Sequence, residues 1–286
     1  REATARDVAA PMHLFKPAPA IRLRASENRD TPPPPSEPRA PNPPAGAVID
    51  YWLTNAAKGA VTLTIKDSSG HIVRRFFSAA KPTRLKADRY FQPGWVGAPK
   101  PLPATAGAHR FVWNLRWPRP PAITYHYSIS AVWPGDTPLV PQGGMALPGN
   151  YTVTLAVNGK RHTQPLTVKM DPRETVAAGT LAANLNLEHA ISAELERAIA
   201  AYDASGKRVE ALRRRGGDQA KAQIKAIEAW RDRGKDSLRN VSGVLDTLAT
   251  HLEMSDAAPT EGQRAVYAEY SKRLAALFAH SPLSGT

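Results

Sequence analysis

One change of period along the chain constrains its fold more than any other feature. Before residue 170, apolar and polar residues tend to alternate, as in Val-Thr-Leu-Thr-Ile at residues 61–65, and this alternation is typical of half-buried β-strands. After Asp171, apolar residues recur every three or four positions, which is the period of an amphipathic helix. The sequence therefore predicts a multidomain β plus α protein whose two parts meet near Asp171.

Residues 47–170 predict an immunoglobulin- or fibronectin-like antiparallel β-sandwich. Short runs rich in Val, Ile, Leu and aromatic residues follow one another without a helical pattern between them, as in sandwich domains. Residues 67–70 have the composition of a turn, and Asn158 with Gly159 can supply the two positive φ angles of a type I′ hairpin turn. The predicted strands cover residues 47–53, 60–66, 71–77, 110–116, 151–157 and 160–169.

Residues 171–286 predict an all-α helical hairpin or three-helix bundle. Thr180 is placed to cap a first helix, which ends at the glycine pair 216–217 after three arginines. A second helical pattern then continues to Leu252, with Gly234 among its few interruptions. We expect these two helices to pack as a long antiparallel pair.

A third helix is predicted near the end of the chain. Thr260 and Gln263 have the spacing of a capping box, in which each side chain bonds the backbone of the other residue. The apolar face of this helix is expected to consist of Val266, Tyr270, Leu274 and Leu277.

Residues 1–46 predict a proline-rich extended lead-in. Four prolines stand together at residues 32–35 and four more follow by residue 44. Because proline fixes φ and lacks an amide donor, such a stretch favours the polyproline-II conformation of a semi-rigid linker. Two short apolar pieces within it, residues 13–15 and 21–23, could dock on a neighbouring module.

The positive charge of the chain is concentrated on the predicted sandwich. Of the net charge of +13, residues 47–170 supply most, with 15 Lys and Arg against 4 Asp and Glu. A basic run beside aromatic side chains suits an anionic glycan or a nucleic-acid backbone, while a tryptophan core with a solvated loop would give the same pattern. The candidate ligand-binding residues are Arg74, Arg75, Lys81, Arg84, Lys86, Arg89 and Trp95.

The sequence contains no local pattern for catalysis, a cofactor or a metal. It lacks the Gly-x-Ser-x-Gly elbow, glycine-rich phosphate-binding loops and histidine pairs at metal-binding spacing. With no cysteine it cannot form a thiolate zinc site. The acidic residues of the helical part interleave with Lys and Arg, as on a solvated surface. We therefore assign no catalytic, cofactor-binding or metal-binding residue, and none of the sandwich carboxylates Asp50, Asp67, Asp88 and Asp136 is assigned to a catalytic pair.

Several segments resemble one bacterial family. PPAGAVIDYWL at residues 43–53 and VTLTIKDSSG at residues 61–70 are similar to the region that follows the β-propeller in sortilin-like, BNR-repeat proteins often labelled glycosyl hydrolases. AGAHRFVWNLR at residues 106–116, PGNYTVTL at 148–155 and DPR at 171–173 resemble the same region. The last predicted strands also resemble the Ig-like module of flagellar hook-capping proteins.

The resemblance implies an exported protein, periplasmic or extracellular, in which a sialidase-like propeller holds any hydrolase activity. Residues 64–70 do not make a good Asp box of such a propeller, so the chain is expected to be the tail of this family with the propeller missing. We expect a non-catalytic accessory region, binding or structural. Its expected partner is the propeller domain of the same parent protein or another protein.

Two other functions stay open. The sandwich could be an independent carbohydrate-binding module for anionic or neutral glycans, which makes polysaccharide a partner and leaves nucleic acid the least favoured one. Alternatively, the chain could belong to a glycoside hydrolase-related enzyme whose active site lies in the missing propeller or at the junction of sandwich and helices. No stretch reaches the roughly 18 apolar residues of a membrane span.

Overall fold

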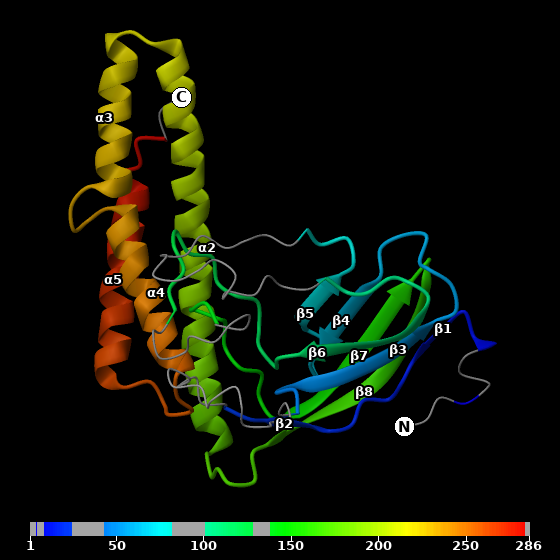
Figure 1. Cartoon of the computed structure of the whole chain (residues 1–286). Helices are drawn as coiled ribbons and strands as arrows, with labels where there is room; N and C mark the ends of the chain where they lie inside the picture. The colour runs from blue at the N-terminus through cyan, green and yellow to red at the C-terminus, as the bar shows by residue number, and fades with distance from the viewer. Residues whose placement is uncertain (1–3, 5–8, 25–42, 82–100, 128–137, 284–286) are drawn as a thin grey trace, which may run out of the picture.

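A β part lies beside a group of long helices in the computed structural model, which describes residues 4, 9–24, 43–81, 101–127 and 138–283. Figure 1 shows the sheets against the lower half of the longest helix, α2 (Ala178–Arg215). The upper half of α2 and the helix beside it extend beyond the sheets. The prediction of a β plus α protein is confirmed.

Two sheets make up the β part. The three-stranded sheet has the order β1-β3-β6, with β1 Met12–Leu14, β3 Ala47–Leu53 and β6 Gly107–Trp113. The five-stranded sheet has the order β2-β8-β7-β4-β5, with β2 Ala20–Arg22, β4 Thr62–Lys66, β5 Ile72–Phe77, β7 Gly149–Val157 and β8 Lys160–Met170.

The lead-in supplies a strand to each sheet. His13 of β1 pairs with Trp52 of β3, and Ile21 of β2 pairs with Lys169 of β8. The prediction that these apolar pieces dock on a neighbouring module is thus confirmed. The pairing of β2 with β8 is parallel, whereas all strand pairs between described residues of 47–170 are antiparallel, as predicted. Because the lead-in, and not a hairpin, delivers β2, this strand does not have to reverse direction against its neighbour.

Both sheets contribute to one hydrophobic core. Alternate residues of β3 are buried, as the period of two requires. Trp113 of β6 is fully buried and its indole N–H donates to the carbonyl of Arg116 at 3.0 Å, so this large side chain leaves no unpaired donor in the core. Asn158 and Gly159 have φ angles of 49° and 79°, which confirms the predicted turn between β7 and β8.

The helical part departs from the prediction at two places. The second predicted helix is two helices, α3 (Asp218–Asp232) and α4 (Leu238–Glu253). Gly234 has a φ of 80°, outside the α-helical range, so a helix cannot continue through it. The Ser237 hydroxyl then accepts a hydrogen bond from Asn240 N and caps the start of α4. Thr180 is not the N-cap of α2, because the helix already begins after Ala177, without a side-chain cap.

The last helix, α5 (Glu261–Ala279), begins as predicted. The Thr260 hydroxyl accepts from Gln263 N at 3.2 Å and the Gln263 side chain accepts from Thr260 N at 2.8 Å. Leu274 is fully buried on the predicted apolar face, while Val266 on that face is exposed. None of the described helices is both long and apolar enough to cross a membrane.

Asp171 marks the transition from strands to helices. Its carboxylate accepts from the backbone N–H of Arg173 at 3.0 Å and from the guanidinium of the same residue at 2.9 and 2.6 Å. These bonds from Arg173 lower the pKa of Asp171 to about 2. The turn that follows β8 is therefore fixed by a local charged pair before α2 begins.

Candidate functional site

The predicted basic run lies only partly within the described residues. Arg74 and Arg75 are successive residues of β5, so their side chains leave opposite faces of the strand. The Arg74 guanidinium carbon lies 5.3 Å from the centre of the Phe76 ring, and burial lowers the pKa of Arg74. Arg75 and Lys81 are exposed. Arg84, Lys86, Arg89 and Trp95 lie outside the described residues, so the assignment of this run as a ligand site stays a prediction.

The tryptophans of the β part have different environments. Trp113 is fully buried in the core of the β part. Trp117 is half-buried and its ring lies edge-on to His189 of α2 with 4.4 Å between ring centres. Trp52 is half-buried on β3 and lines an open groove of about 980 Å³ together with Asp50 and Arg110.

Buried charged groups concentrate where the β part meets the helices. We call this region the junction. Asp256 lies in the turn between α4 and α5. Its carboxylate forms ion pairs with the guanidinium groups of Arg22 and Arg24, each at 2.6 Å. Although burial opposes it, the hydrogen bonds from these two arginines lower the pKa of Asp256. The charged residues of the junction are Arg22, Arg24, Arg116, Glu188, Glu253 and Asp256.

Glu253, the last residue of α4, forms the second connection across the junction. Its carboxylate accepts from the backbone N–H of Gln142, 2.7 Å from each oxygen, and from the Arg116 guanidinium at 3.2 Å. Arg116 also donates to the carbonyl of Gly143 at 2.8 Å. Glu253 is only 6% exposed, so this pair is shielded from solvent. The helix end is thus bonded both to a side chain and to the backbone of the β part.

Glu188 of α2 lies against the same segment of the β part. A Cβ atom on Gly144 would come within 1.9 Å of a Glu188 carboxylate oxygen and 2.6 Å of Leu185 Cδ1, so a larger residue would require these side chains to move. Burial, and then the charge of Glu253, raise the pKa of Glu188 to about 7. The glycine pair 143–144, which fits no phosphate-binding motif, therefore serves close packing at the junction.

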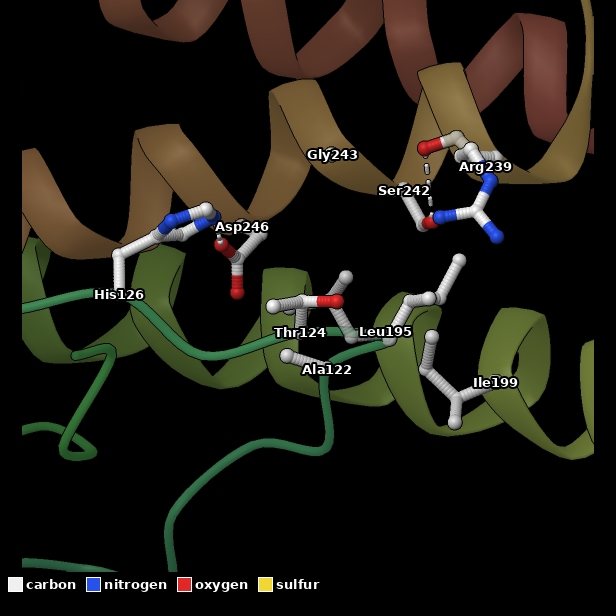
Figure 2. A pocket seen from close by; sticks show the side chains of 10 residues that line it. Ala122, Thr124, His126, Leu195, Ile199, Arg239, Ser242, Gly243 and Asp246 are labelled. Carbon is white, nitrogen blue, oxygen red and sulfur yellow. Dashed lines mark hydrogen bonds and ion pairs between the residues drawn. The ribbon is translucent and has the colours of Figure 1, made fainter. Parts of the chain in front are cut away.

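A pocket of about 270 Å³ opens beside the junction (Figure 2). It lies between α2, which contributes Leu195 and Ile199, and α4, with residues 122–126 crossing over it. On the α4 side Asp246 is 5% exposed, and its Oδ2 lies 3.9 Å from His126 Nε2. The residues that line this junction pocket are Ala122, Ile123, Thr124, His126, Leu195, Ile199, Arg239, Ser242, Gly243 and Asp246.

Asp246 is the least satisfied of these polar groups. Its Oδ1 has no hydrogen-bond partner among the residues that the structure describes. Burial, and then the charge of Glu253, raise its pKa to about 7. A buried carboxyl with such a pKa in a pocket is a candidate functional group, since it can exchange a proton or pair with a cation near neutral pH.

The sequence interpretation missed these acids because it placed all acidic residues of the helical part on a solvated face. A signal was present. Ser242, Asp246 and Glu253 follow one another at intervals of four and seven residues, which puts them on one side of α4, next to its apolar stripe. Within the described ranges, no group of three or more His, Asp or Glu side chains is arranged to hold a metal ion.

Comparison with known proteins identified no relative of this chain. No protein-family model matches the sequence, and neither the curated proteins nor the solved structures gave a match.

Proposed function

We propose that this chain is a non-catalytic accessory region, binding or structural, of an exported BNR-repeat, sortilin-like propeller protein. The observation that carries the proposal is the junction, where ion pairs of Glu253 and Asp256 connect the helices to the β part. Asp256 is paired with two arginines from the lead-in, and Glu253 with Arg116 and a backbone N–H. These groups hold the helical bundle in one position on the sheets, as a spacer or docking arm requires.

The physical argument rests on the cost of an unmatched charge in a buried site. Removing one partner of a buried ion pair typically costs about 3–5 kcal/mol, because the other charge stays desolvated. Any displacement of the helices from the sheets would separate Glu253 from Arg116 and Asp256 from Arg22. A helical bundle held in this way has a fixed orientation relative to the sheets and to any domain that the sheets are attached to.

The origin of the chain tests this proposal. An antibody against the chain would be used to purify the native protein from the producing cells and from their periplasmic and extracellular fractions, followed by intact-mass measurement and peptide sequencing. We expect a larger polypeptide that contains a propeller, located outside the cytoplasm. A native polypeptide of about 31.0 kDa without a propeller, retained in the cytoplasm, would refute it.

The groove on the three-stranded sheet favours a second candidate, a carbohydrate-binding module. Trp52 offers an aromatic face. Beside it, the Arg110 guanidinium donates two hydrogen bonds to the Asp50 carboxylate, at 2.8 and 2.9 Å, in a bidentate pair. Aromatic faces and polar planar groups together are suited to sugar rings. Affinity electrophoresis through neutral and anionic polysaccharides is the test, with Trp52→Ala for the groove and Arg75→Ala for the basic run. Migration that no polysaccharide retards would exclude this candidate.

We further propose that the two sheets are an immunoglobulin-like sandwich. A shared core between a three-stranded and a five-stranded sheet and the β7–β8 hairpin support this assignment. The parallel β2–β8 pair is an addition made by the lead-in. An experimental structure tests the assignment through the connections between the two sheets.

A further inference from the structure

The junction pocket is lined by a buried carboxylate, Asp246, one of whose oxygens lacks a hydrogen-bond donor in the described part of the chain. Asp246 Oδ1 has no partner among the described residues, and Oδ2 is 3.9 Å from His126 Nε2, beyond hydrogen-bond reach. One turn earlier on the same face of α4, the Ser242 hydroxyl donates its proton to the Leu238 carbonyl at 2.6 Å. The Ser242 oxygen can therefore still accept a hydrogen bond, so a donor from outside that bonds Asp246 can bond Ser242 as well.

The remaining surface of the pocket is largely aliphatic. Leu195 and Ile199 of α2 face α4 across the pocket, and Ala122 and Ile123 belong to the segment that crosses it. Arg239, at the other end of the pocket, already pairs with Asp232 at 2.9 Å. A volume of about 270 Å³ exceeds what a bare metal ion needs, and fits a small organic molecule.

We propose that the junction pocket binds a small primary aliphatic amine, with its ammonium group on Asp246 and Ser242 and its hydrocarbon part against Leu195 and Ile199. An ammonium group carries three donors and a positive charge. It therefore satisfies a buried carboxylate and a hydroxyl oxygen at once, which a neutral alcohol with one donor cannot do. The site is separate from the accessory role proposed above and does not depend on it.

The charge state of Asp246 sets the conditions of the test. The titratable and charged groups around it are His126 and Tyr125 on the crossing segment and Glu253 and Arg239 on α4. Because burial raises the pKa of Asp246 to about 7, binding is best measured at pH 8, where the carboxylate is ionised and an alkylamine is still protonated.

The experiment is a titration of the full chain with n-butylamine at pH 8, followed by calorimetry and by amide NMR shifts. We expect saturable binding with a dissociation constant on the order of 1 mM, as befits a ligand of this size. n-Butanol, which has the same shape without the charge, and butyrate, which has the opposite charge, should bind at least ten times more weakly. Shifted amides should belong to residues that line the pocket.

Two variants separate loss of the site from loss of the fold. Asp246→Asn keeps the shape of the side chain, removes the charge and should weaken butylamine binding at least tenfold, while circular dichroism shows a folded protein. Asp203→Asn changes an exposed acid on α2 and should leave binding as it is. Equal binding of butanol and butylamine, undiminished binding by Asp246→Asn, or no saturable binding to the unmodified chain would each overturn the proposal.

Discussion

Stability should fall as the pH rises from 5 to 8, and Glu188 should cause a large share of this fall. Burial and the charge of Glu253 raise the pKa of Glu188 from 4.5 to about 7. Between these values the folded protein holds a proton that the unfolded chain has released, so the contribution of Glu188 to stability is most favourable below about pH 4.5 and declines until about pH 7. For one carboxyl this amounts to an upper value of about 3 kcal/mol.

Glu188→Gln is the perturbation that isolates this effect. Glutamine has nearly the same shape and no charge at any pH, so the variant loses the contribution of this group to the pH dependence. Its free energy of unfolding relative to the unmodified protein should rise by roughly 2–3 kcal/mol between pH 5 and pH 8. Glu196→Gln, an exposed glutamate on the same helix, is the matched control.

Urea unfolding at pH 5, 6, 7 and 8, followed by tryptophan fluorescence and by circular dichroism, measures these differences. The slope with denaturant should stay the same among the three proteins, so that midpoints can be compared. If the difference between Glu188→Gln and the unmodified protein is the same at pH 5 and pH 8, then Glu188 is not held in the buried, charge-repelled environment described for it.

Three further substitutions test the packing, each measured by urea unfolding at pH 7. Glu253→Ala should cost about 3–5 kcal/mol, because the buried Arg116 guanidinium loses the carboxylate that balances its charge. A loss below about 1 kcal/mol would mean that solvent reaches the junction. Gly144→Ala should cost about 1–3 kcal/mol, because the new Cβ would meet the Glu188 side chain. Gly206→Ala, on α2, should gain about 0.5–1 kcal/mol, because its Cβ would make only an ordinary contact with Arg231 of α3. Equal effects of the two substitutions would contradict the close contact at Gly144. Ser237→Ala should cost about 1 kcal/mol through loss of the α4 cap, and an unchanged midpoint would argue against that cap.

Features set by neighbouring residues could be predicted from the sequence. The turn at Asn158 and Gly159 needs only two residues that accept positive φ, and the capping box of α5 needs only Thr260 and Gln263. The break between α3 and α4 was missed because the apolar period continues across it. Gly234 interrupts this period in the sequence, but its positive φ depends on the turn that the packed helices impose.

Burial set by distant residues could not be predicted in the same way. The buried Arg22 is paired with a carboxylate that lies 234 residues further along the chain. No local pattern distinguishes Arg22 from the other arginines of the lead-in. Glu188 and Asp246 look like solvated helix residues until the β part covers them. The candidate pocket therefore emerged only with the packing of the two parts.

The fixed position of the helices on the sheets is the central claim, and a distance between two spin labels tests it most directly. The chain has no cysteine, so Ser69→Cys in the β4–β5 turn and Lys207→Cys on α2, both exposed, accept labels at these two places alone. Double electron–electron resonance should give one narrow distance distribution, which broadens when Glu253→Ala and Asp256→Ala are added. A broad or multiple distribution in the protein with an intact junction would show that the two parts move independently and would contradict the account.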